Sequence, residues 1–278
     1  SLYVLIIHFL LKKVPLIDTK NHKLTIIANL VCSYGMLFSF LYQGYSTLSI
    51  ILSTITIIIA CFFAFFVFKD LKKNNNKPWF DEHRTQYETA RADFFSMIEK
   101  LIPAIAKFDE PIGHLTVKET VFRINRDVRF SKDKSPYKNN MACYFNQAGK
   151  NGLGAGYYLH IEPGKSFAAG GIWVPEPAVL AGIRQEIDYN FADWKKILEN
   201  KSFKKVFTDG ITSNDTLVRP PKGYDENNPA IEFLKMKSFI VRKSFADADL
   251  PDKNFATEVA KTFNTMKPLI DFLNTAIH

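Results

Sequence analysis

The chain has 278 residues, of which 47% are hydrophobic and 23% charged, and this length suffices for one sizeable core or two small ones. Its 36 Lys and Arg exceed its 28 Asp and Glu by eight, a balance that favours an anionic partner but excludes the dense positive charge of histone-like proteins. The cysteines, Cys32, Cys61 and Cys143, are too few and too scattered for a disulfide framework, which predicts a reducing compartment.

Residues 24–68 contain no Asp, Glu, Lys or Arg. This stretch divides at residues 43–46, which predicts transmembrane helices at about 24–42 and 47–68, each long enough to span about 30 Å of hydrocarbon. Lysines flank the pair on both outer sides, so the positive-inside rule places both ends in the cytoplasm. We therefore expect residues 1–68 to form a membrane hairpin in the inner membrane, and residues 69–278 to form a soluble cytoplasmic domain with a net charge of +5.

The alternative to a hairpin is an error in the gene model. The chain begins with Ser1, and the second apolar run continues at Phe68 directly into the first expected helix of the domain. A signal peptide does not fit, because it would be a single apolar run of about 7–15 residues before a cleavage site. Without the hairpin, the domain would be cytoplasmic with no anchor.

Beyond Lys69 the patterns predict an α+β domain with a mostly antiparallel sheet flanked by helices. Strands are expected at residues 121–124, 141–146, 155–162, 166–174 and 237–244. Further helices are expected within 175–207 (two or three), at 229–235, and at 252–277 with an interruption near Pro268. Apolar residues at steps of three and four predict an earlier amphipathic helix, bent at Pro103, whose inward set is Tyr87, Ala90, Phe94, Ile98, Leu101 and Ile105.

Residues 121–138 carry six basic and two acidic side chains. The planar guanidinium of arginine suits bidentate binding of phosphate or carboxylate. Asp127 and Asp133 are expected to orient the basic side chains. The expected ligand-binding residues are Arg123, Arg126, Arg129 and Lys134.

His160 and Tyr137 are the candidate catalytic residues. In the predicted strand, His160 shares a face with Tyr158 and Glu162, so the carboxylate would orient the imidazole as a general base. The alternative is a half-buried histidine with no chemical role. No cofactor or metal ion is expected, because the glycine clusters lack the strand–loop–helix context and the histidines lack metal-ligand spacing.

The motif of Arg123, Arg126, Asp127, Arg129, Phe130, Asp133, Lys134 and Tyr137 resembles the signature of a bacterial family, domain-of-unknown-function family 2461. Residues 71–80, 158–164 and 219–224 are also similar to that family. The resemblance covers about Lys69 to the C-terminus and implies a single-domain bacterial protein, without an established activity to carry over. The family pattern contains no membrane hairpin.

These observations favour a membrane-attached cytoplasmic domain that binds or acts on a small anionic ligand. Whether it is an enzyme is left open. One alternative is nucleic-acid binding through the same basic segment, which the modest charge makes the second choice. Another is a non-catalytic interaction module, in which the arginines form a structural salt-bridge lattice with Asp127 and Asp133.

Overall fold

A computed structural model describes residues 67–277, which belong to the compact unit Ala60–His278. The hairpin predicted at about 24–42 and 47–68 lies outside the described residues, apart from Val67 and Phe68. These two side chains are buried in the hydrophobic core of the unit. Within residues 67–277, no helix combines the length and the apolar character needed to cross a membrane.

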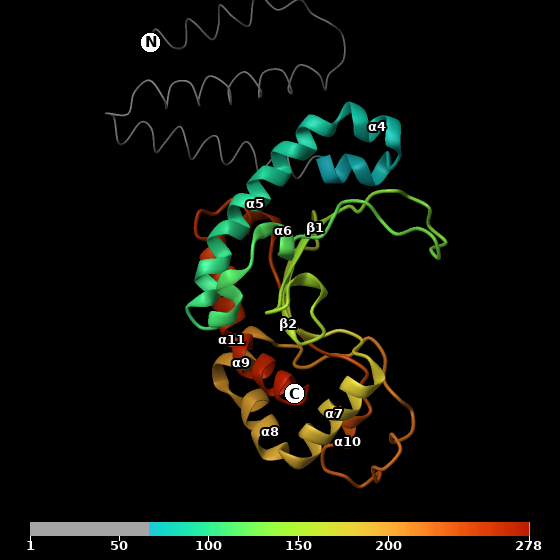
Figure 1. Cartoon of the computed structure of the whole chain (residues 1–278), viewed down its shortest axis with the longest axis vertical. Helices are drawn as coiled ribbons and strands as arrows, with labels where there is room; N and C mark the ends of the chain where they lie inside the picture. The colour runs from blue at the N-terminus through green and yellow to red at the C-terminus, as the bar shows by residue number, and fades with distance from the viewer. Residues whose placement is uncertain (1–66, 278) are drawn as a thin grey trace, which may run out of the picture. The chain divides into compact units, whose positions relative to one another are not determined.

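The centre of the described domain is a four-stranded antiparallel sheet with the strand order β1-β2-β3-β4, shown in Figure 1. This arrangement confirms the predicted α+β class and the antiparallel sheet. The register aligns Cys143, Leu159, Ala168 and Lys243 across the four strands, so these residues share one face. The strands are β1 (Met141–Phe145), β2 (Gly156–Ile161), β3 (Phe167–Ile172) and β4 (Phe239–Ser244).

Two long helices, α5 (Arg84–Ala106) and α11 (Phe255–Thr275), cover that face of the sheet, as Figure 1 shows. All six residues predicted to face inward on α5 are buried. On α11, the Phe263 ring contacts the rings of Phe145 and Tyr157, with centroids 6.0 and 5.2 Å apart. The core therefore lies between the sheet and these two helices.

The predicted interruption near Pro268 is wrong, because α11 continues through this residue to Thr275. A proline removes one backbone hydrogen bond and crowds the preceding turn, which costs about 3 kcal/mol in a helix interior. Here Met266, Leu269 and Ile270 are buried on either side of the proline. Their packing offsets the lost hydrogen bond.

The remaining described helices lie around this core. Residues 67–73 are helical. The prediction of two or three helices within 175–207 is confirmed, with Ile183, Ile187 and Trp194 fully buried. The α-helices are α4 (Lys77–Glu82), α6 (Val117–Thr120), α7 (Pro177–Tyr189), α8 (Phe191–Glu199), α9 (Lys201–Val206) and α10 (Ile231–Leu234). The 3-10 helices are η1 (Glu110–His114), η2 (Gly149–Asn151) and η3 (Asp247–Asp249).

The strand predicted at residues 121–124 is wrong. The segment meets β1 only through the bridge between Val121 and Cys143, in which the Phe122 N–H donates to the Ala142 carbonyl (3.0 Å). It then leaves the edge of β1, because its next backbone groups pair with a later part of the same loop.

That pairing makes an irregular hairpin of residues 121–140, which we call the arginine hairpin. The Arg126 N–H donates to the Pro136 carbonyl (2.9 Å), and the Lys138 N–H donates to the Ile124 carbonyl (2.8 Å). Figure 1 shows the hairpin extending away from the sheet, before β1. It therefore projects beside the sheet face that α5 and α11 leave open.

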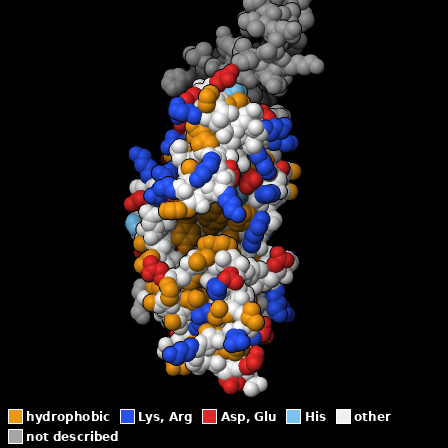
Figure 2. All heavy atoms as spheres, turned by 90° about the vertical axis from the view of Figure 1, so that its right-hand side faces the viewer, with side chains coloured by type: hydrophobic (Ala, Val, Ile, Leu, Met, Phe, Trp, Pro, Cys, Tyr) orange, Lys and Arg blue, Asp and Glu red, His pale blue; other side chains and the backbone are white. Residues whose placement is uncertain are grey.

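On that open face the register places Ala142, Tyr158, His160, Phe167 and Arg242. Figure 2 views the molecule from the right-hand side of Figure 1, away from α5. It shows a hollow with hydrophobic side chains at its floor and Lys and Arg side chains around it. The open face thus combines an apolar floor with a basic margin.

Candidate functional site

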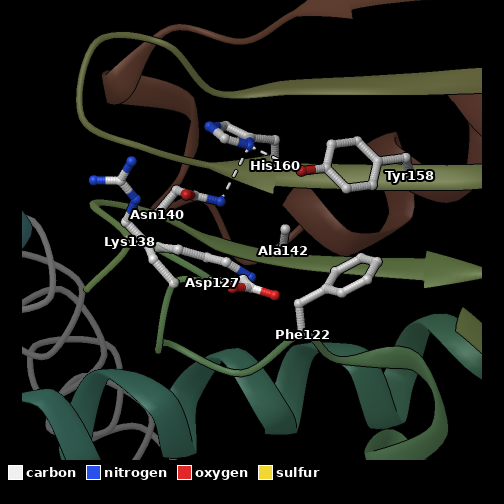
Figure 3. Close-up of a pocket in the computed structure, with 8 residues that line it drawn as sticks. Phe122, Asp127, Lys138, Asn140, Ala142, Tyr158 and His160 are labelled. Carbon is white, nitrogen blue, oxygen red and sulfur yellow. Dashed lines mark hydrogen bonds between the residues drawn. The ribbon is translucent and has the colours of Figure 1, made fainter. Parts of the chain in front are cut away.

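A pocket of about 470 Å³ opens between the arginine hairpin and the first two strands. The hairpin and the residues just before β1 supply one part of its lining, and β1 and β2 supply the rest, as Figure 3 shows. Its lining residues are Phe122, Arg126, Asp127, Lys138, Asn140, Ala142, Tyr158 and His160.

Ala142 forms the floor of the pocket between two aromatic walls. Figure 3 shows its methyl group between the Phe122 ring on one side and Tyr158 with His160 on the other. Phe122 stands beside Ala142 because its N–H bonds to the Ala142 carbonyl, and His160 stands on the other side because it is the register partner of Ala142 in β2. The Phe122 and Tyr158 ring centroids are 6.3 Å apart.

His160 is held by hydrogen bonds at both ring nitrogens. Its Nε2 lies 3.1 Å from Oε2 of Glu162, so the predicted contact between these two residues is present. Its Nδ1 lies 3.2 Å from Nδ2 of Asn140 and 3.1 Å from the Tyr158 hydroxyl. Because a carboxylate can only accept, Nε2 carries the hydrogen and Nδ1 accepts.

The charge state of this network follows from burial. Burial lowers the pKa of His160 below its ordinary value, and the Glu162 carboxylate only partly opposes this effect. The imidazole is therefore neutral at pH 7. Burial also raises the pKa of Tyr158 to about 12, which keeps its hydroxyl protonated as a hydrogen-bond donor.

Two of the predicted arginines pair with the acids inside the hairpin. Arg126 forms an ion pair with Asp133, and its Nη1 also donates to the Ser135 carbonyl (3.2 Å). Arg129 binds Asp127 in a bidentate manner, with Nε 2.9 Å from Oδ1 and Nη2 2.6 Å from Oδ2. These contacts are the arrangement that the salt-bridge alternative describes, although Arg126 also lines the pocket.

The same contacts lower the pKa of both acids. Hydrogen bonds from the Ser135 hydroxyl and N–H, followed by that from Arg126, lower the pKa of Asp133 to about 2. The Arg129 side chain and N–H lower the pKa of Asp127. Both carboxylates are therefore ionised near neutral pH, and each forms an ion pair with one arginine.

Residues 62–272 match the model of a protein family described as conserved hypothetical protein (DUF2461). The chain belongs to this family. The match confirms the resemblance seen in the sequence, and it spans the sheet, α5, the arginine hairpin and α11 as far as residue 272. No curated protein and no solved structure matches the chain. The pocket thus lies wholly within the DUF2461 region.

The structure does not bring the remaining predicted residues into the DUF2461 pocket. Arg123 is exposed, and the Lys134 ammonium donates to the Val128 carbonyl (2.9 Å) across the hairpin tip. Tyr137 is buried and stacks on Phe80, with ring centroids 4.0 Å apart. Its ring therefore belongs to the core, and none of these three residues lines the pocket.

Sequence reasoning missed Lys138 as a site residue of the DUF2461 domain. Its side chain is half-buried in the pocket, with Nζ 5.4 Å from the centre of the Phe122 ring. No carboxylate within residues 67–277 lies within ion-pair distance of it. Burial, and next the charge of Arg123, lower its pKa. The sequence signal that could have identified Lys138 is its spacing of two residues from Asn140 and four from Ala142, because alternate residues of an extended segment share a face and all three line the pocket.

Two other kinds of chemistry find little support in the described part of the DUF2461 domain. Residues 67–277 contain no group of three or more His, Cys, Asp or Glu that could hold a metal ion. Cys143 is fully buried on the helix-covered face, and burial raises the pKa of its thiol. A buried thiol of this kind is a poor nucleophile.

Proposed function

We propose that the pocket binds a small anionic ligand through a phosphate or carboxylate group, with Lys138 as its main charged contact. The observation that carries the proposal is the half-buried Lys138 ammonium, which has no carboxylate partner among residues 67–277. Removing a charge from water without a counter-ion costs free energy. An anion in the pocket would supply that counter-ion.

The other polar groups of the pocket suit the same ligand. Arg126 adds a guanidinium, which Asp133 also pairs, and Asn140 has a second amide N–H beside the one that faces His160. Asp127 is the one carboxylate in the lining, and both of its oxygens accept hydrogen bonds from Arg129. Arg129 therefore offsets the charge that would otherwise repel an anion. A catalytic role for His160 stays a prediction.

The proposal is tested by replacing Lys138 with methionine and titrating the protein with phosphate and with acetate. Lys132→Met is the matched control, because Lys132 is an exposed lysine of the same hairpin outside the pocket and its loss changes the net charge equally. We expect Lys138→Met to weaken binding about tenfold or more, as loss of a charged hydrogen bond does. Equal affinities of the two variants would contradict the proposal.

Nucleic-acid binding is the second candidate, favoured by the open sheet face. Arg242 lies over the Phe167 ring, with its guanidinium carbon 3.9 Å from the ring centre, and Tyr158 lies on the same face. Single-stranded nucleic acids bind to surfaces that combine aromatic rings with cations. Such binding would weaken steeply with salt, because each neutralised phosphate releases a counter-ion. Absence of binding to single strands at low salt would exclude this function.

Attachment to the inner membrane through residues 24–68 also stays a prediction from sequence. If the hairpin is inserted, the full chain should remain in the membrane fraction after extraction with carbonate at high pH. A peripherally bound protein would be released by that wash. Recovery of the chain in the supernatant would therefore contradict the hairpin.

A further inference from the structure

We infer that the ligand is a planar aromatic ring carrying the acidic group, such as an aromatic carboxylate or an aryl phosphate. The inference rests on the proposed anion binding and adds the class of ligand. Its basis is the shape of the pocket, in which a single methyl group, that of Ala142, separates two aromatic walls.

The spacing of the walls follows from the sheet. Phe122 and His160 flank Ala142 on either side, so they are two strand spacings apart, or about 9–10 Å at the backbone. Carbon atoms in contact lie about 3.5–4.0 Å apart, so a flat ring with a neighbour on each face needs about 7–8 Å. The backbone spacing therefore leaves room for one ring between Phe122 and His160, whereas the Phe122 and Tyr158 rings, 6.3 Å apart, are too close to admit one between them.

His160 gives the pocket one flat wall. Phe167 lies on the far side of His160 from β1 and stacks on it, with centroids 4.8 Å apart and planes inclined by 16°. One face of the imidazole is thus occupied by Phe167, and no ring of residues 67–277 stacks on the opposite face. This free face is available for stacking with a planar ring.

The position of Lys138 indicates where the acidic group of the ligand would lie. Its Nζ lies 5.4 Å from the centre of the Phe122 ring, so an acid attached to a ring beside Phe122 reaches the ammonium directly. The volume of about 470 Å³ lies in the range of pockets for small organic ligands. A free phosphate or acetate ion would leave most of it unfilled.

Titration of the full chain with matched pairs of small acids tests the inference. Benzoate is compared with acetate, and phenyl phosphate with inorganic phosphate, which also separates carboxylate from phosphate recognition. Cyclohexanecarboxylate has the charge and size of benzoate but a puckered ring. We expect each aromatic acid to bind about tenfold tighter than its ring-free partner, and benzoate to bind tighter than cyclohexanecarboxylate.

Ala142→Leu provides the matching test on the protein, because leucine fills the gap without removing a polar group. Ala169→Leu is the control, since Ala169 lies on the same sheet face outside the pocket lining. We expect Ala142→Leu to lose the preference for aromatic acids over their ring-free partners. Ala169→Leu should keep this preference.

The outcomes separate this inference from the proposed function. If acetate and phosphate bind but benzoate gains nothing, or gains no more than cyclohexanecarboxylate, the inference is overturned and anion binding stands. If no acid binds at all, the proposed function fails as well. Should Ala142→Leu not fold, Phe122→Leu replaces it: this variant keeps an apolar wall, and retention of the benzoate preference in it would overturn the inference.

Discussion

The Nε2 atom of His160 lies 3.1 Å from Oε2 of Glu162, yet burial lowers the pKa of the histidine. The unfolded chain takes up a proton near pH 6.5, whereas the folded protein does so only at lower pH. The stability due to neutral His160 is therefore complete above about pH 6.5 and is lost as the pH falls below it. We expect His160→Gln to lose less stability than the wild type between pH 7.5 and pH 5, measured by urea denaturation.

Glu162→Gln gives the control for this pH effect. Glu162 raises the pKa of His160 and so partly opposes burial. Its removal should lower the pKa of His160 further, and the loss of stability at acidic pH should then be larger than in the wild type. An unchanged pH dependence in both variants would show that His160 does not titrate in this range.

Asp133 is expected to fix the tip of the arginine hairpin. Its carboxylate accepts hydrogen bonds from the Ser135 N–H (2.9 Å) and hydroxyl (2.6 Å), and it pairs with Arg126. Asp133→Asn removes the charge from these contacts. We expect faster cleavage by trypsin at the exposed residues Arg129 and Lys132, while the melting temperature stays within a few degrees, because the site is on the surface. Cleavage at the wild-type rate would contradict this role.

Gly171 is expected to be one of the residues least tolerant of substitution. Its φ is +127°, and a Cβ atom there would lie 1.9 Å from the Phe239 carbonyl oxygen in β4. Gly171→Ala should therefore destabilise the fold by roughly 3 kcal/mol or more, as judged by chemical denaturation. Gly210 also has a positive φ, of +64°, but open space around it, so Gly210→Ala should cost only about 1 kcal/mol. Similar losses for the two variants would show that the close approach of β4 has no effect.

Cys143 should be unreactive in the folded protein. Its thiol is fully buried, and burial raises its pKa. Thiol reagents act on the exposed thiolate, so a maleimide should label the Cys143 peptide only after denaturation, as followed by mass spectrometry. Labelling under native conditions would require the sheet to open.

The sequence predicted those elements whose pattern is set locally. The apolar spacing of α5 identified that helix, because burial of one face imposes the period, and glycine- and proline-containing turns marked the ends of β1, β2 and β3. The predictions failed where contacts between residues far apart in the sequence determine the local structure. Buried neighbours carry α11 through Pro268, and residues 124–126 pair with 136–138 instead of extending a strand.

The candidate site likewise contains some contacts that local spacing predicts and others that depend on the fold. The contact of His160 with Glu162 was predictable, because residues two apart on a strand share a face. The six basic residues of the hairpin look alike in sequence, and only the fold shows that Lys138 is half-buried beside Phe122 while Lys134 caps the hairpin tip. The core position of Tyr137 depends on Phe80, which lies far away in the chain.

The order in which the pocket forms follows from a single side chain. The side-chain amide of Asn75 donates to the Tyr137 carbonyl (2.9 Å) and accepts from the Tyr137 N–H (3.0 Å). It thus makes both backbone hydrogen bonds that a neighbouring strand would otherwise make, although Asn75 lies 62 residues away in the sequence. Closing so long a loop is entropically costly and therefore slow. Lys138 follows Tyr137 directly, so we expect its ammonium to reach its place only after residues 67–76 have docked. The pocket is therefore complete only when this contact between residues far apart in the chain has formed.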